Sequence, residues 1–238
     1  ASTAMEAARV AEKVRINPGN FSRDLSRVKE LLSQFFDICR EHKTCVRIGV
    51  NHGSLPPHIL ETYGNSPEGM CRAAMEYLSL CRELDFDNVI VSLKSSNTRI
   101  MVQANRMLVA RMEEAGMSYP VHLGVTESGS GRQGRLKSAA GIITLLKEGI
   151  GDTFRVSLTE APEEEIRFGK LFLSVKEEVR VSSWDELIVS ACYKWAPGLL
   201  DGTTDWKALP MPFVQASFAN EEALKDFCMD LLQATRCV

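Results

Sequence analysis

Residues 45–51 read CVRIGVN, a short run of β-branched residues that carries an arginine in its middle and ends in asparagine. Runs of the same kind recur along the chain, at residues 13–17 (KVRIN), 88–93 (NVIVSL), 121–125 (VHLGV) and 153–158 (TFRVSL). The segments between them have helical periodicity, and one apolar stripe is formed by Leu25, Val28, Leu32, Phe35 and Cys39. A spacing of about 30 to 45 residues between the runs is typical of strand–helix–strand units. The alternation predicts a parallel sheet covered by helices.

Two architectures fit this alternation, an open doubly wound sheet and a closed (β/α)8 barrel. An open sheet usually has a glycine-rich phosphate loop after its first strand, and no G-x-G-x-x-G sequence follows residues 13–17. A barrel places its functional residues at the C-terminal ends of its strands, where polar residues occur here. The predicted strands are too few to close a barrel, so others must be absent, most simply before Ala1. We therefore expect an α/β fold in which residues 1–175 form a partial TIM-type (β/α)8 barrel, strands 4–8, and residues 176–238 form a separate, incomplete domain.

Three of the runs contain arginine, although the strands of a parallel sheet are usually continuous hydrophobic runs. Because side chains alternate along a strand, each arginine shares a face with a polar residue further along the same run. The pairs are Arg15 with Asn17, Arg47 with Asn51, and Arg155 with Ser157. The apolar residues between them take the opposite face, under the helices. We expect the polar set to point into the barrel.

Guanidinium groups inside a barrel need an anionic partner, because an unpaired buried charge is strongly destabilising. One alternative is that internal carboxylates neutralise the arginines, or that they lie at exposed strand ends. The other is an anionic ligand at the barrel mouth, which arginine binds in the bidentate manner that suits phosphate. Lys94, directly after the run at 88–93, adds a further cation. This much positive charge favours a diphosphate or a phosphodiester over a single carboxylate.

Glu127 ends the sequence VHLGVTE and is the carboxylate that is placed like these cations. A dry site would raise its pKa and suit it for proton transfer, whereas a salt bridge to an arginine is the structural alternative. The segment from Ser128 to Ser138 is rich in glycine and is expected to be a loop that enters a helix. Its backbone amides are candidates for a phosphate cradle, and a mobile loop is the equal alternative.

Composition argues against several classes of function. The formal net charge of −3 gives no reason to expect a nucleic-acid partner. No apolar run approaches the roughly 18 residues of a membrane span, so we expect no membrane partner either. The 7 cysteines include no C-x-x-C pair. We expect reduced core thiols and no metal site in this chain.

Six motifs follow one another in order: VRINPGN (14–20), RIGVNHGSL (47–55), VSLKSSN (91–97), HLGVTESG (122–129), GRLKSAAGI (134–142) and GDTFRVSLTEAPEEEI (151–166). Together they resemble the 4-hydroxy-3-methylbut-2-enyl diphosphate synthase family, which belongs to the methylerythritol phosphate route to isoprenoids. The HGSL and LTEAPEEEI sequences are similar to the plant and chlamydial branch, which has an extra domain inserted after the barrel. The resemblance implies that this chain is a fragment and that residues 176–238 begin the insert.

The same resemblance implies an activity and a role for each polar residue. The family's enzymes are iron–sulfur oxidoreductases that open the ring of 2-C-methyl-D-erythritol 2,4-cyclodiphosphate to give 4-hydroxy-3-methylbut-2-enyl diphosphate. Glu127 would be the catalytic residue, assisting protonation of the departing hydroxyl. The cyclic diphosphate would be bound and positioned by Arg15, Asn17, Arg47, Asn51, Lys94, Arg155 and Ser157.

Cofactor, partners and compartment are also implied by the resemblance. The full-length enzyme would hold a [4Fe-4S] cluster through a C-P-x-C motif that this sequence does not contain, so the fragment alone is expected to be inactive. Ferredoxin or flavodoxin would donate electrons, and the full-length protein would be a homodimer. It would be plastid-located in a eukaryote and cytoplasmic in a bacterium. Two alternatives stay open: a barrel enzyme for a phosphosugar or pterin-type substrate, with Lys94 as a Schiff-base residue, and a non-catalytic phosphometabolite-binding segment.

Overall fold

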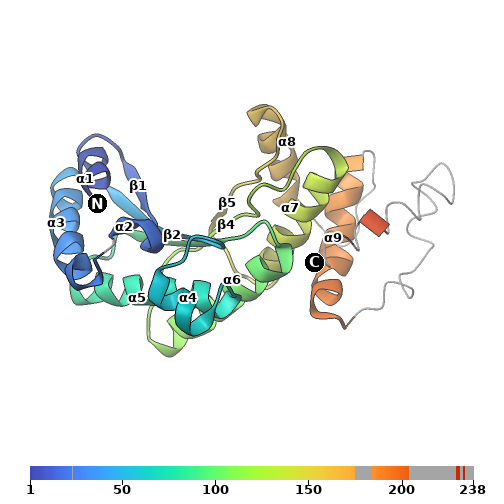
Figure 1. Ribbon diagram of the computed structural model, residues 1–238. Coiled ribbons are helices and arrows are strands. Elements are labelled where there is room, and N and C mark those ends of the chain that lie inside the picture. The colour runs from blue at the N-terminus through green and yellow to red at the C-terminus, as the bar shows by residue number, and fades with distance from the viewer. Residues whose placement is uncertain (23, 175–183, 204–228, 231–232, 234–238) are drawn as a thin grey trace, which may run out of the picture. The chain divides into compact units, whose positions relative to one another are not determined.

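The computed structural model describes residues 1–22, 24–174, 184–203, 229–230 and 233 (Figure 1). The chain divides into two compact units. The first unit comprises Ala1–Lys94, Gln103–Leu123 and Gly151–Thr153. The second unit comprises Ser95–Val102, Gly124–Ile150 and Phe154–Val238.

The first unit is built on a parallel sheet. Its strands are β1 (Lys13–Ile16), β2 (Cys45–Asn51) and β3 (Val89–Lys94), in the order β1-β2-β3. A parallel bridge between Val91 and Val121 leads from β3 toward β4 (His122–Leu123), and β4 pairs with β5 (Thr153–Phe154). Each predicted run therefore contains a strand. Within the described residues the strands do not close on themselves, as expected of a partial barrel.

The first unit also contains helices. In chain order they are α1 (Ser2–Ala8), α2 (Pro18–Phe21), the 3-10 helix η1 (Leu25–Arg27), α3 (Val28–His42), α4 (Pro57–Tyr63), α5 (Pro67–Glu83) and the greater part of α6 (Thr98–Glu114). Of these, α1, α2 and α5 pack against the sheet. Helix α5 packs on β2 and β3, while α1 packs on β1 and α3 (Figure 1). The predicted apolar stripe is buried from Val28 to Cys39. The prediction was wrong for Leu25, which is 53% exposed because it belongs to η1, before α3 begins.

The last two strands are shorter than the sequence predicted, because backbone groups around them have other partners. Beyond Phe154, the amide of Leu158 donates to the Glu165 carboxylate at 2.8 Å. The amide of Thr159 donates to the Gly129 carbonyl at 2.9 Å. Every backbone amide needs an acceptor, and these amides find one in a side chain and a loop rather than in a neighbouring strand.

The second unit is mainly helical in its described residues. It contains α7 (Gly131–Lys147), α8 (Pro162–Phe172), α9 (Trp184–Asp201) and the start of α6. Helix α9 packs along α7 and also contacts α8 (Figure 1). The domain boundary expected after residue 175 lies at the edge of residues 175–183, which fall outside the described part, so the division at that point stays a prediction.

Arg135 joins the three long helices of the second unit. From α7 its guanidinium reaches Glu160 at 2.6 Å, Glu164 of α8 at 3.8 Å and Asp185 of α9 at 3.1 Å. The group also lies 5.6 Å from the ring centroid of Phe168. Because the side chain is only 13% exposed, these charges are weakly screened and fix α7, α8 and α9 together.

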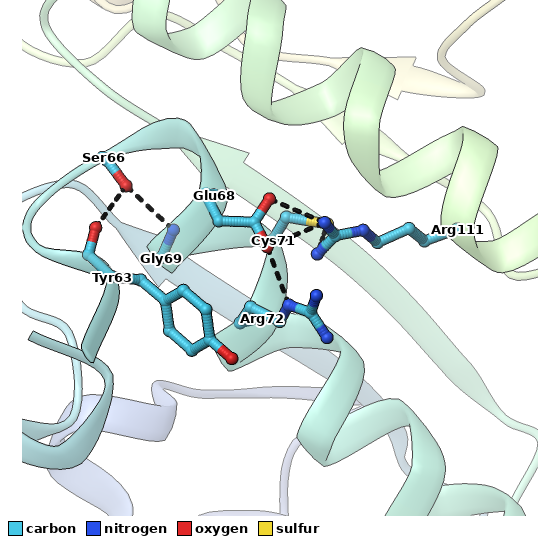
Figure 2. Close-up of polar contacts among 7 residues, drawn as sticks. All are labelled: Tyr63, Ser66, Glu68, Gly69, Cys71, Arg72 and Arg111. Atoms are coloured by element: carbon cyan, nitrogen blue, oxygen red, sulfur yellow. Dashed lines mark hydrogen bonds and ion pairs between the residues drawn. The ribbon is translucent and has the colours of Figure 1, made fainter.

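In the first unit, an ion-pair cluster joins α5 to α6 (Figure 2). Arg111 of α6 donates to both carboxylate oxygens of Glu68, at 2.7 and 2.6 Å, and Arg72 donates to the same carboxylate at 2.7 Å. Burial would raise the pKa of Glu68, but the hydrogen bonds from Arg111 and Arg72 outweigh it and lower the pKa below its ordinary value of 4.5. Cys71 lies against Arg111, and burial raises the pKa of this thiol to about 11. The thiol is therefore protonated at neutral pH and is part of the core.

Replacing Glu68 by glutamine is expected to lower the free energy of unfolding at pH 7 by about 1 kcal/mol, because the three charge-assisted hydrogen bonds from Arg111 and Arg72 weaken in a partly solvated site. The folded-state pKa is below the unfolded one, so this stabilisation is present above pH 4.5 and disappears as the pH falls through the folded-state value. Denaturation midpoints measured from pH 3 to pH 7 should therefore converge for Glu68→Gln and the unsubstituted protein at the acid end. Glu83→Gln is the matched control, since Glu83 pairs with Lys29 in the open, and an equal effect of this control would contradict the prediction.

Candidate functional site

One face of the sheet in the first unit is polar. The strand register pairs Arg15 with Arg47 and Asn51 with Lys94, so these four residues lie on the same face. The residues that alternate with them are buried on the other face: Val14, Ile16, Val46, Ile48, Val50, Val91 and Leu93. The predicted alternation of the first two strands is therefore observed. Two adjacent arginines on neighbouring strands repel one another, and this arrangement favours an anion between or above them.

Arg15 lies across Gly49 of β2. Its Nη2 donates to the Gly49 carbonyl at 2.8 Å. A Cβ at position 49 would lie 2.3 Å from Arg15 Nε, so only glycine leaves room for the Arg15 side chain in its present position. Arg15 is exposed on this face of the sheet, and partial desolvation lowers its pKa, although a guanidinium stays charged at neutral pH. No carboxylate of the described ranges pairs with this cation, which is thus held in place with its charge available to a ligand.

The two asparagines lie at the ends of β1 and β2 and are joined through Ser54. Asn17 caps α2 by accepting from the Gly19 amide at 3.1 Å, and its Nδ2 donates to Ser54 Oγ at 2.9 Å. The Ser54 amide donates in turn to the Asn51 carbonyl at 3.1 Å. Asn17 therefore organises the loops at this end of the sheet. Its expected contact with a ligand stays a prediction.

Glu127 lies in the second unit, in the turn between β4 and α7. It is exposed, and its φ of +50° is in the left-handed region. Within the described ranges, the other non-glycine residues with positive φ are Lys43 and Asp85. They follow the ends of α3 and α5, where this conformation is common. Left-handed backbone costs a residue with a Cβ about 1–2 kcal/mol. Strain of this kind, held by the surrounding structure, often marks functional positions.

Ser157 and Arg155 lie on the segment that follows β5, also in the second unit. The carbonyl of Ser157 accepts from the amide of Ser128 at 3.3 Å, which ties this segment to the turn that carries Glu127. The side chain of Arg155 is 63% exposed because the short strand ends before it, as in the alternative in which an arginine lies at an exposed strand end. Glu165 pairs with Arg155 at 3.5 Å, and the expected contact of Arg155 with a ligand stays a prediction.

The glycine-rich segment from residue 128 to 138 is mostly helix, not loop. Helix α7 begins at Gly131, after Ser130. The amide of Gly131 donates to Glu160 at 2.6 Å, so a carboxylate of the chain itself already occupies the start of this helix. Hydrogen bonds from Arg135 and Gly131 hold the pKa of Glu160 below its usual range, and the group is charged at neutral pH. The mobile-loop alternative is therefore wrong for residues 131–138, and a phosphate cradle there would have to displace Glu160.

The described residues offer no ligand set for a metal centre. No group of three or more His, Cys, Asp or Glu side chains among them could hold a metal ion. Their cysteines are free thiols: Cys39, Cys45, Cys71, Cys81 and Cys192. Cys228 and Cys237 lie outside the described part of the chain. Among the helices of that part, none is long and apolar enough to cross a membrane.

Residues 1–170 match the model of the GcpE TIM-barrel domain. The chain belongs to the GcpE family. All eight predicted site residues fall inside the matched range. This match also explains the open sheet of the first unit, because the strands described here are part of a barrel architecture.

Related proteins carry consistent names. The flavodoxin-type 4-hydroxy-3-methylbut-2-en-1-yl diphosphate synthase of Bacteroides fragilis is 49% identical over 177 residues, which cover 67% of this chain and 28% of the relative. The ferredoxin-type enzyme of Microcystis aeruginosa is 49% identical over 180 residues, covering 68% and 44%. The chloroplastic, ferredoxin-type enzyme of Oryza sativa is 47% identical over 182 residues, covering 69% and 24%. This GcpE-family chain thus spans less than half the length of each of these relatives.

Proposed function

We propose that this chain is the substrate-binding barrel segment of a 4-hydroxy-3-methylbut-2-en-1-yl diphosphate synthase. The full-length protein would convert 2-C-methyl-D-erythritol 2,4-cyclodiphosphate into 4-hydroxy-3-methylbut-2-enyl diphosphate, with uptake of two electrons and loss of water. The proposal is carried by the cationic face of the first unit, in a chain that matches the GcpE barrel domain over residues 1–170.

Binding of the diphosphate would fall to the cations of that face. Arg15 and Arg47 lie side by side in register, and Lys94 is the register partner of Asn51. Phosphate oxygens accept bidentate hydrogen bonds from guanidinium groups, and the lysine adds a point charge. Asn17 and Asn51 would position the ligand. Arg155 and Ser157 would also take part in binding it.

Glu127 would supply the proton that leaves with the hydroxyl group. Its carboxylate is exposed and makes no hydrogen bond or ion pair with another described residue, so no described side chain occupies it. A carboxyl group that becomes desolvated when substrate binds has a raised pKa and is then a competent general acid.

The redox centre and the partners belong to the proposal for the full-length protein. A [4Fe-4S] cluster would supply electrons, but the described residues do not fit such a cluster, and no electron-transfer step is assigned to them. Ferredoxin or flavodoxin, named for the relatives, would be the donor. The full-length protein would be a homodimer, located in a plastid or, in a bacterium, in the cytoplasm.

Turnover by the full-length protein tests this function. The protein would be purified without oxygen, reduced with flavodoxin or ferredoxin, and given the cyclic diphosphate, with the product identified by mass spectrometry. The expected product is 4-hydroxy-3-methylbut-2-enyl diphosphate. Unchanged substrate would contradict the proposal, and a borohydride-trapped adduct on Lys94 with a carbonyl substrate would favour the Schiff-base alternative.

A further inference from the structure

The turn around Glu127 is held by backbone hydrogen bonds on both sides of this residue. Before it, the amide of Thr126 donates to the Ser95 carbonyl at 3.1 Å. After it, the amide of Ser128 donates to the Ser157 carbonyl at 3.3 Å. These contacts constrain the φ of +50° at Glu127, which a free loop would relax.

A buried chain of hydroxyl groups closes the same turn from within. Ser138 Oγ donates to Ser128 Oγ at 3.0 Å, and Ser128 Oγ donates to the Val125 carbonyl at 3.2 Å. Val125 precedes Glu127 and Ser128 follows it, so these hydrogen bonds connect the two ends of the turn. Ser138 is 0% exposed and belongs to α7, so it anchors the turn to a helix of the packed core.

Burial alone does not distinguish Ser138 from the other hydroxyl residues of α7. Thr144, on the same helix, is equally buried, and its Oγ1 has no hydrogen-bond partner in the part of the chain that the structure describes. Ser138 differs because its hydroxyl reaches out of the helix to the turn. A buried donor that has a well-placed acceptor fixes the geometry of both groups.

We propose that Ser138 and Ser128 are positioning residues that set the orientation of Glu127 for proton delivery. This inference rests on the proposed function, in which Glu127 is the catalytic acid. Neither serine touches the substrate; both act through the backbone of residues 125–128. Arg15, Arg47 and Lys94, which are assigned to the diphosphate, lie on β1, β2 and β3 and not on the turn of residues 125–128, so the pair acts mainly on the chemical step and changes substrate affinity little.

Ser138→Ala in the full-length protein tests the proposal, with Thr144→Val as the matched control on the same helix. Ser138→Ala is expected to lower kcat by about 10- to 100-fold, as small misplacements of catalytic groups do, with KM for the cyclic diphosphate within about twofold. The control should leave both constants unchanged. Amide hydrogen exchange of residues 126–129 should accelerate by about tenfold in Ser138→Ala and stay the same in Thr144→Val.

Ser128→Ala removes the other hydroxyl of the pair, on the side of the turn. It should also lower kcat and accelerate amide exchange at residues 126–129. Agreement between the two variants would exclude a packing defect in α7 as the cause. Unchanged exchange at residues 126–129 in both serine variants would overturn the positioning role, whatever their activity. A rise in KM with constant kcat would overturn it too, because it would place the serines in binding. Absence of turnover by the unsubstituted protein would instead overturn the proposed function, while the exchange data would still decide whether the pair holds the turn.

Discussion

Glu127→Gln in the full-length protein is expected to lower kcat by about 10²- to 10⁴-fold, the range in which a single general acid contributes to catalysis. Glutamine keeps the size and the hydrogen-bonding capacity of the side chain but cannot deliver a proton. Because Glu127 is exposed and makes no hydrogen bond or ion pair within the described residues, folding should not suffer. Steady-state kinetics with the cyclic diphosphate measures the effect, and calorimetric binding of the same compound should give an unchanged Kd.

Glu163→Gln provides the control for this substitution, since Glu163 is an exposed carboxylate of the same unit, in the first turn of α8. The Glu163→Gln variant should have the same kcat as the unsubstituted protein. A Glu127→Gln variant that retains full kcat would remove this residue from the mechanism. A variant that loses binding instead would indicate that the carboxylate orients the substrate.

Gly49→Ala is expected to weaken binding of the cyclic diphosphate by about 10- to 100-fold, the worth of one or two charge-assisted hydrogen bonds. The added Cβ would lie 2.3 Å from Arg15 Nε and 3.0 Å from its Cδ, so the guanidinium must leave its place on the Gly49 carbonyl. Calorimetric titration of the full-length protein measures the affinity, and circular dichroism shows whether the fold is retained.

A double-mutant cycle makes this prediction specific. If Gly49 acts by placing Arg15, then adding Gly49→Ala to an Arg15→Ala background should cause little further loss. Gly169→Ala is the glycine control, because its Cβ would meet its nearest neighbour at an ordinary 3.4 Å. Additive losses in the cycle would contradict the role given to Gly49.

The sequence predicted the strands well because their signal is local. In β1 and β2, buried aliphatic residues alternate with polar ones at a period of two, and the same alternation placed Arg15 and Arg47 on one face. The match to a barrel domain family then confirmed the fold class that this pattern indicated. Prediction was weaker after residue 121, because the strands there are too short for periodicity to define their ends.

Other features could not be predicted because they depend on residues far apart in the chain. The bond from Arg15 to the carbonyl of Gly49 joins positions on neighbouring strands, and the glycine alone gave no indication of it. Helix α9 runs through Pro197, although proline usually ends a helix, and its packing on α7 outweighs that local preference. The link between Ser138 and Ser128 likewise requires knowing that α7 begins at Gly131.

The carboxylate of Glu160 at the start of α7 has a consequence for inhibitor design. A helix start usually attracts phosphonates, sulfates and buffer phosphate, and compounds are often built to exploit that attraction. Here the amide of Gly131 and the guanidinium of Arg135 already donate hydrogen bonds to the carboxylate of Glu160. An anionic inhibitor would compete with a tethered ligand that never diffuses away, so its acidic groups are better directed at the cationic face carried by β1 and β2.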